Sequence, residues 1–149
     1  MAQIYNVGVK IVNKSNNPLP SYATEGSAGM DLRANLTDKV IISPLQRKII
    51  PTGIFIELPE GFEAQIRPRS GMAMNSGLTI VNTPGTVDCD YRGEILICLI
   101  NLSEDVCAIR NGDKIAQMII ARYEKVNLIQ VAELSNTQRG TDGFGSTGK

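Results

Sequence analysis

A chain of 149 residues is long enough for one domain with a core of its own. Its 15 basic and 15 acidic residues are interspersed, so it lacks the Lys/Arg cluster with which proteins grip a nucleic-acid backbone. No apolar run approaches the length of a membrane-spanning helix, and residues 1–4 do not open a signal peptide, so we expect a cytoplasmic protein without nucleic-acid or membrane partners.

Short runs rich in Ile and Val, each bounded by turn residues, predict an all-β protein. In chain order, we expect strands at residues 7–11, 40–42, 53–58, 62–66, 78–81, 94–100, 115–123 and 126–131. The sequence Leu58-Pro59-Glu60-Gly61 predicts a tight turn, and Asn111-Gly112 predicts a hairpin because both residues tolerate positive φ. Regular short strands with such turns favour an antiparallel sandwich or barrel.

Three segments lack the strand pattern. Residues 13–29 predict a long loop, and residues 70–75 predict one or two turns of helix that end at Gly77. From residue 135 onward, dense glycines cannot hold a strand or helix alone, so we divide the chain into a barrel, residues 1–134, and a mobile arm, residues 135–149. The lone ring of Phe144 either lies in water at a frayed terminus or reaches a pocket elsewhere.

Two carboxylates, Asp88 and Asp90, lie between Gly85 and Gly93 and are followed directly by Tyr91. If this segment is extended, both carboxylates point to one face, because side chains alternate along a strand. The chain has no histidine, so proton transfer near neutral pH must fall to a carboxylate, Lys, Tyr or Cys. The two aspartates are therefore the first candidates for a general base, although Tyr91 alone is more often a packing residue.

A candidate phosphate-binding segment opens the short helix. Arg69 offers a guanidinium fork, Ser70 a hydroxyl donor, and Gly71 allows the backbone to approach an anion closely. The alternative is that Ser70 only caps the helix.

The arm also contains groups suited to a polyphosphate. Residues 143–149 match most of a nucleotide P-loop, but that loop requires a preceding strand and a following helix, so we do not expect a P-loop NTPase. Flexible glycines beside Arg139 could still wrap a polyphosphate, with Ser146 and Thr147 as donors.

Other polar positions carry weaker signals. Cys89, Cys98 and Cys107 are too widely spaced for a zinc site and odd in number for a disulfide framework, and we expect Cys98 to be a small buried apolar residue. Asp31 is isolated and would ordinarily be a solvated loop or strand-edge residue. Gln117 interrupts an apolar strand, so it faces either solvent or a polar site.

Five segments carry these residues in order along the chain. They are Ala28-Gly29-Met30-Asp31-Leu32-Arg33-Ala34, Pro68-Arg69-Ser70-Gly71-Met72-Ala73, residues 81–93, Gly112-Asp113-Lys114-Ile115-Ala116-Gln117, and Arg139-Gly140 with residues 143–148. Together they resemble the five motifs of the trimeric deoxyuridine triphosphatase (dUTPase) family. Only about the first two dozen residues lie outside the motif span.

The resemblance implies a jelly-roll-like β fold with one short helix and a flexible C-terminal arm. It also implies a homotrimer in which the arm of one subunit closes over a neighbour's active site. The expected reaction is hydrolysis of dUTP to dUMP and pyrophosphate with Mg²⁺, which lowers dUTP and supplies dUMP for thymidylate synthesis. Magnesium prefers phosphate oxygens and retained waters, which accounts for the lack of a visible ligand cluster.

The resemblance also implies a role for each site residue. Asp88 would orient and deprotonate the water that attacks the α-phosphorus, Tyr91 would exclude a 2′-hydroxyl, and Asp31 would meet the magnesium through a water. The remaining residues would bind substrate: Asn82 with the backbone of the hairpin from Gly85 through Thr86 and Val87 to Leu96 for uracil; Arg69, Ser70, Gly71 and Gln117 for phosphates; Arg139, Gly145 and Ser146 in the arm for the triphosphate; and Phe144 for stacking on the base.

One position departs from the family pattern, and two other functions stay open. The family usually has a small residue at Asp142, so this carboxylate either points outward or weakens arm closure. Asp90 could assist with the metal or only stabilise the turn. The alternatives are a dCTP deaminase-like enzyme of the same fold and a non-catalytic, nucleotide-gated binding module.

Overall fold

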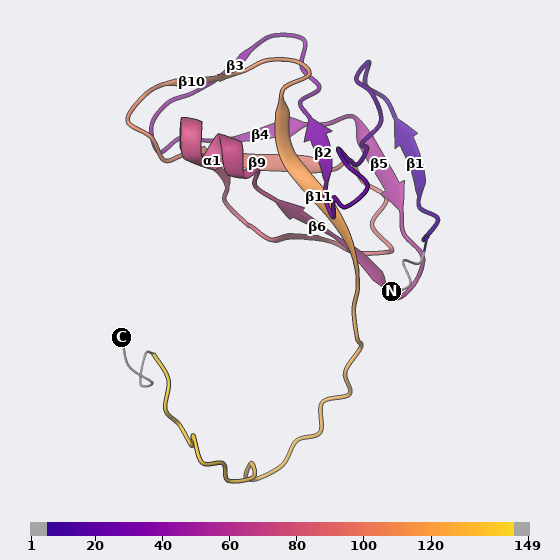
Figure 1. Ribbon diagram of the computed structural model, residues 1–149, viewed down its shortest axis with the longest axis vertical. Helices are drawn as coiled ribbons and strands as arrows, with labels where there is room; N and C mark the ends of the chain where they lie inside the picture. Colours follow the sequence, from indigo (N-terminus) through magenta and orange to yellow (C-terminus); the bar gives the residue numbers. More distant parts are fainter. Residues whose placement is uncertain (1–5, 145–149) are drawn as a thin grey trace.

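The computed structural model describes residues 6–144, which form eleven short strands and one helix (Figure 1). The elements are β1 (Lys10–Asn13), β2 (Met30–Arg33), β3 (Val40–Ile42), β4 (Arg47–Pro51), β5 (Ile54–Glu57), β6 (Phe62–Arg67), α1 (Ser70–Ser76), β7 (Leu78–Ile80), β8 (Gly85–Val87), β9 (Leu96–Asn101), β10 (Cys107–Ile109) and β11 (Lys114–Arg122). The predicted all-β fold with one short helix is confirmed.

The strands pair antiparallel in four small sheets. The largest has the order β2-β11-β6-β8, a second has the order β4-β9-β7, and β1-β5 and β10-β3 form two-stranded sheets. Most pairs join segments far apart in the chain, as when β11 pairs with both β2 and β6. The long strand β11 thus connects β2, from the first part of the chain, to β6, from its middle.

The core follows from the alternation of apolar residues. In β9, Ile97, Leu99 and Asn101 point inward while the residues between them face outward. Asn101 is a buried amide, and its side chain donates to the carbonyl of Ile42 at 2.9 Å and to that of Asp105 at 2.7 Å. These bonds satisfy the one polar side chain that this strand buries.

The short helix and its end match the sequence. Helix α1 covers Ser70–Ser76, and Gly77 ends it in the left-handed conformation, with φ of 62°. A Cβ at Gly77 would also lie 2.8 Å from that of Ser103, so a glycine is required for space as well as for conformation. The turn at Pro59 is confirmed too, since Phe62 N–H donates to the Pro59 carbonyl at 3.3 Å and Gly61 has φ of 84°.

Three local predictions are wrong. Gly112 has the expected positive φ, but the strands on either side, β10 and β11, belong to different sheets, so Asn111 and Gly112 do not form a hairpin. Residues 126–131 form no strand and pair with no other strand among residues 6–144. Cys98 is only half-buried, since it points to the outer face of β9.

The chain leaves the barrel after β11 and continues as a long tail (Figure 1). Four apolar side chains of this tail, Val126, Leu128, Ile129 and Leu134, are largely exposed. Within residues 6–144, the only helix is too short and too polar to cross a membrane.

Candidate active site

A pocket lies between β6, β8 and the start of β9. Its lining includes seven residues that the sequence singled out: Asn82, Gly85, Thr86, Val87, Asp88, Tyr91 and Leu96. It also includes four that sequence reasoning missed: Ile66, Ile80, Glu94 and Ile95. Ile66, Ile80 and Ile95 are buried, so the base of the pocket is apolar and its rim is polar.

The pairing of β8 with β6 positions the polar rim of the pocket. Gly85 of β8 pairs with Ile66 of β6 and is buried against it. A Cβ at Gly85 would lie 3.2 Å from the Asn82 amide nitrogen and 3.4 Å from the Ile66 Cβ. The absence of a side chain at Gly85 therefore leaves room for the Asn82 carboxamide at the pocket edge.

Asp88 lies in a turn that directly follows β8. Tyr91 N–H donates to the Asp88 carbonyl at 3.1 Å, and the Arg92 guanidinium donates to the carbonyls of Cys89 at 2.7 Å and Tyr91 at 3.0 Å. The segment is therefore not extended, so the condition under which Asp88 and Asp90 would point to one face of a strand is not met. Asp88 lines the pocket, whereas Asp90 is exposed in the turn and is not among the lining residues.

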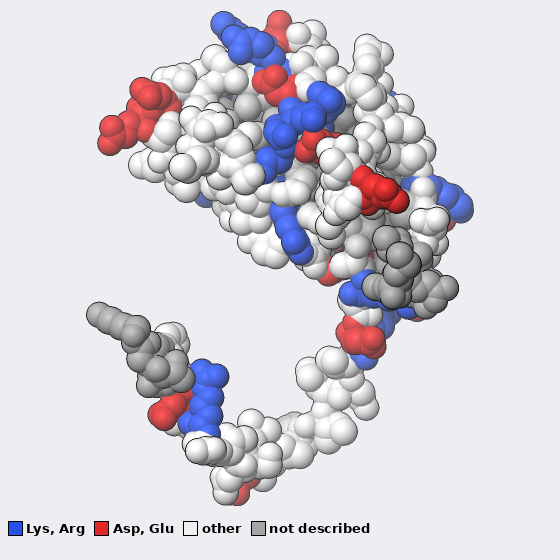
Figure 2. Space-filling view, viewed as in Figure 1, with Lys and Arg blue, Asp and Glu red and all other residues white. Residues whose placement is uncertain are grey.

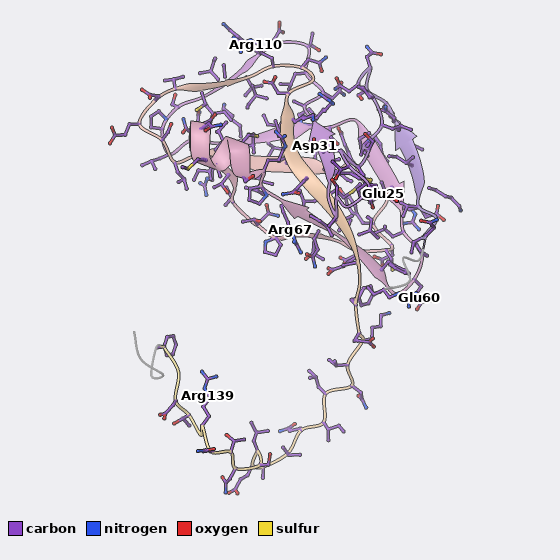
Figure 3. All side chains as sticks on the ribbon, in the orientation of Figure 1. Glu25, Asp31, Glu60, Arg67, Arg110 and Arg139 are labelled. Atoms are coloured by element: carbon purple, nitrogen blue, oxygen red, sulfur yellow. The ribbon has the colours of Figure 1, made fainter. Side chains whose placement is uncertain are left out.

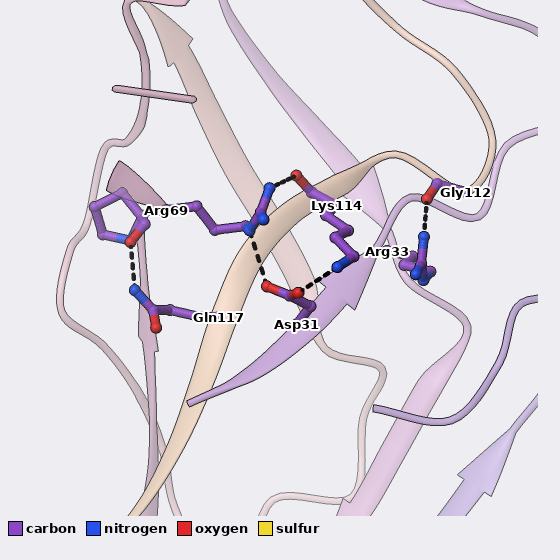
Figure 4. Close-up of polar contacts among 7 residues, drawn as sticks. Asp31, Arg33, Arg69, Gly112, Lys114 and Gln117 are labelled. Atoms are coloured by element: carbon purple, nitrogen blue, oxygen red, sulfur yellow. Dashed lines mark hydrogen bonds and ion pairs between the residues drawn. The ribbon is translucent and has the colours of Figure 1, made fainter. Parts of the chain in front are cut away.

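A second polar cluster joins β2, β11 and the start of α1 (Figure 4). The two carboxylate oxygens of Asp31 accept from Arg69 Nε at 2.8 Å and from Lys114 Nζ at 2.8 Å. Arg69 also donates from Nη1 to the Lys114 carbonyl at 3.2 Å. Gln117 lies opposite Asp31 in the strand register and donates from Nε2 to the Pro68 carbonyl at 3.0 Å.

The cluster carries excess positive charge on the barrel surface. One carboxylate faces two cations, and Figure 2 shows basic side chains gathered over β2 and β11. Burial pushes the pKa of Asp31 upward, but the hydrogen bond from Lys114 and the charge of Arg69 outweigh burial and hold the pKa below its ordinary value. Asp31 is therefore ionised at neutral pH, and the cluster suits an anion.

The first turn of α1 has no serine cap. Arg69 occupies the N-cap position, and no side chain caps the first turn, so the interpretation of Ser70 as a helix cap is wrong. Ser70 and Gly71 are exposed at the end of the helix nearest Arg69.

Within one chain, the pocket around Asp88 and the polar cluster around Asp31 lie apart. Asp31 is on β2, one edge of the four-stranded sheet, whereas Asp88 follows β8, the opposite edge. Val87 pairs with Ala64 near one end of β6, and Arg69 follows the other end. Strands lie about 4.8 Å apart and rise about 3.3 Å per residue, so Asp88 and Asp31 are separated by on the order of 20 Å.

The tail holds the remaining predicted residues away from the barrel. Arg139 lies on the tail, remote from Asp31 (Figure 3), and its Nε donates to the backbone carbonyl of Asp142 at 2.8 Å. Phe144 is fully exposed. Gly145 and Ser146 lie outside the described residues.

The side chains around Asp31 fit magnesium only when a phosphate supplies most of the ligands. Within residues 6–144, no three His, Cys, Asp or Glu side chains gather closely enough to hold a metal ion. Both oxygens of Asp31 already accept from cations, which disfavours direct coordination, but each oxygen keeps a lone pair that could accept from a metal-bound water.

The chain is similar to known proteins over nearly its whole length. A family model for dUTPase matches residues 15–148. The deoxyuridine 5′-triphosphate nucleotidohydrolase of Cytophaga hutchinsonii is 57% identical over 95% of this chain and 92% of its own length, and that of Finegoldia magna is 54% identical over 94% and 98%. Among solved structures, the dUTPase of Staphylococcus bacteriophage 80alpha with dUPNHPP has a TM-score of 0.86 at 25% identity, over 95% of this chain and 99% of that one.

Proposed function

Because this chain belongs to the dUTPase family, we propose that it hydrolyses dUTP to dUMP and pyrophosphate. The observation that supports this proposal best is the single pocket that gathers Asn82, Asp88 and Tyr91 within a chain of that family. In the cytoplasm, this reaction would lower dUTP and supply dUMP for thymidylate synthesis.

The pocket is proposed to hold the deoxyuridine. Asn82 and the backbone between Gly85 and Leu96 offer hydrogen-bonding groups for the uracil edge, which distinguishes uracil from cytosine. Close walls of the pocket would exclude the methyl group of thymine. The Tyr91 ring lines the side where the sugar would lie and would leave no room for a 2′-hydroxyl.

The proposed chemistry is an in-line attack of water on the α-phosphorus. Asp88 would orient this water and take its proton as the new P–O bond forms, while the bond to the bridging oxygen breaks and pyrophosphate leaves. Arg69, Ser70, Gly71 and Gln117 would hold the phosphates through charge and hydrogen bonds. When bound, magnesium neutralises phosphate charge, and Asp31 is the described residue that would reach it, through a water.

A complete site requires more than one subunit in this proposal. Asp31, the ion-pair partner of Arg69, and Asp88 lie at opposite edges of one sheet. In this proposal, Asp88 of one copy would therefore meet Arg69 of another. Two features favour such an assembly, which we propose is a homotrimer. The outer face of the sheet β4-β9-β7 exposes Ile49, Leu96 and, just past β7, Val81, and the tail exposes further apolar residues.

The arm is proposed to close over a neighbouring subunit's site. Arg139, Gly145 and Ser146 would contact the triphosphate, and Phe144 would stack on the base. A fully exposed ring on a tail that leaves the barrel favours a binding partner outside its own barrel. Closure would exclude water other than the attacking molecule.

Pyrophosphate release from dUTP tests the function directly. At catalytic protein concentrations with Mg²⁺, we expect one pyrophosphate and one dUMP per dUTP, with much slower release from dCTP and UTP. Ammonia from dCTP would instead identify a deaminase. Tight dUTP binding with no product of either kind would leave a nucleotide-gated binding module and would contradict the proposal.

A further inference from the structure

The ring of Tyr91 is held in place by contacts that the proposed reaction does not use. Its first contact is with Gly93, two residues along the chain. A Cβ at Gly93 would collide with the Tyr91 hydroxyl and ring, and would lie 2.9 Å from the ring carbon Cε2. The tip of the ring therefore lies against a backbone position that has no room for a side chain, and this close approach restricts where the ring can turn.

The second contact anchors the tip of the ring. The Tyr91 hydroxyl donates a 3.0 Å hydrogen bond to the backbone carbonyl of Glu94. A hydrogen bond at the far end of the ring limits rotation about both side-chain torsions, because a swing of the ring would break it. The position of the Glu94 carbonyl therefore sets the position of the Tyr91 ring.

Glu94 is itself tied to the barrel. Its side-chain Oε1 accepts a 2.7 Å hydrogen bond from the backbone N–H of Gly53, a buried residue with φ of 70° in the link between β4 and β5. The next residue, Ile95, is fixed at both its backbone groups: its N–H donates to Ile54 at 2.8 Å, and its carbonyl accepts from the buried Thr52 hydroxyl at 2.7 Å. The half-buried Glu94 side chain thus connects the link between β4 and β5 to the wall of the pocket.

We propose that Glu94 is a positioning residue for sugar selection: through Gly53 on one side and the Tyr91 hydroxyl on the other, it holds the Tyr91 ring where a ribose would collide. This inference rests on the proposed function, in which Tyr91 faces the sugar. Asn82 also lines the pocket but makes no hydrogen bond to Glu94, so we expect the selection of the base to be independent of this contact.

Ratios of kcat/KM test the inference, because a general loss of stability lowers the rates with all substrates together. In Tyr91→Phe and Glu94→Ala, we expect the preference for dUTP over UTP to fall about tenfold, while the preference for dUTP over dCTP changes less than about twofold. Glu94→Gln keeps an oxygen that can accept from Gly53 and is the matched control. It should hold the sugar preference within about twofold of the unmodified protein.

Affinities for dUMP and UMP, measured by calorimetry on the same proteins, make the test independent of turnover. The ratio of these affinities should fall in Tyr91→Phe and Glu94→Ala and hold in Glu94→Gln. An unchanged sugar preference in Tyr91→Phe and Glu94→Ala overturns the inference. An equal fall in the sugar and base preferences overturns it too, because that result indicates a loosened pocket. If Glu94→Ala does not fold, Tyr91→Phe decides. Failure of the unmodified protein to hydrolyse dUTP would contradict the proposed function. The dUMP and UMP affinities would still test whether Glu94 positions the Tyr91 ring for sugar selection.

Discussion

Gly29 lies directly against the side chain of Gln117: a Cβ added at Gly29 would lie 2.5 Å from Gln117 Oε1. On its other side, the Gln117 carboxamide donates from Nε2 to the Pro68 carbonyl at 3.0 Å. The amide is thus held between two segments that precede β2 and α1. The lack of a side chain at Gly29 therefore limits where the Gln117 carboxamide can lie in the polar cluster around Asp31.

The substitution Gly29→Ala should weaken triphosphate binding. The added methyl group must push the Gln117 carboxamide aside, and the misplaced amide would lose the hydrogen bond to phosphate that we propose for it. We expect KM for dUTP to rise about tenfold, with a smaller change in kcat. Gly26→Ala is the control, because an added Cβ there meets nothing within 4 Å. Equal KM values for the two variants would remove Gln117 from the phosphate site.

The ion pairs of Asp31 should make stability depend on pH in the acid range. The folded-state pKa of Asp31 is lowered from 3.8, so its contribution is fully present above that value and is lost as pH falls through the lowered pKa. We expect Asp31→Asn to lose about 1 kcal/mol in urea unfolding, constant from pH 7 to about pH 5. The difference should shrink below pH 3.8.

Asp38→Asn provides the control for this prediction. Asp38 is exposed and has no ion pair among residues 6–144, so its replacement should change the unfolding free energy little at any pH. A loss of the same size in both variants would mean that the Asp31 pairs add nothing beyond a surface charge.

Magnesium should matter for turnover and not for the fold. Since residues 6–144 contain no cluster of metal ligands, the ion is expected to arrive with the triphosphate. A chelator should abolish pyrophosphate release from dUTP, yet shift the Tm of the nucleotide-free protein by less than about 1 °C. A rise of several degrees on adding Mg²⁺ to the nucleotide-free protein would instead indicate a site built by protein groups alone.

Most of the strands that the sequence predicted have a buried apolar face. Strands β5, β6, β7, β9 and β11 alternate Ile, Leu or Ala with other residues, and that alternation is visible without a structure. Strands β2 and β4 were missed because charged residues such as Asp31 and Arg47 interrupt short runs. The opposite error occurred at residues 126–131, where a strand was predicted and none forms. Apolar residues alone do not make a strand without a neighbouring strand to pair with.

The candidate site shows the same division. Asp88, Asn82 and Tyr91 lie close together in the sequence, so their shared pocket could be predicted from one motif. Lys114 was not predicted, because its contact with Asp31 arises only from the pairing of β11 with β2. Glu94 was missed for a related reason: its partner, Gly53, is distant in the chain.

Asp88 should be required for chemistry and not for binding. Asp88→Asn keeps the shape of the side chain but removes the base, so turnover should fall by about a thousandfold or more while a non-hydrolysable dUTP analogue still binds. Asp90→Asn is the comparison, because Asp90 is exposed outside the pocket, and its turnover should stay within about tenfold of normal. Full activity of Asp88→Asn would exclude Asp88 as the base.

Two truncations should separate the role of the arm from the role of the tail that precedes it. Deletion of residues 136–149 removes Arg139 and Phe144 but keeps the exposed apolar residues of the tail. We expect this protein to keep its assembly, measured by light scattering, and to lose about a hundredfold in kcat/KM, because the site no longer closes.

Deletion of residues 124–149 should also disrupt the assembly. It additionally removes Val126, Leu128, Ile129 and Leu134, which are exposed in one chain and which we propose pack against another copy. All residues of the barrel core precede Arg122, so the fold should survive and the protein should become smaller in light scattering. If both truncated proteins keep the same mass as the full chain, the tail does not hold subunits together. If the shorter deletion leaves turnover unchanged, the arm is only a frayed end.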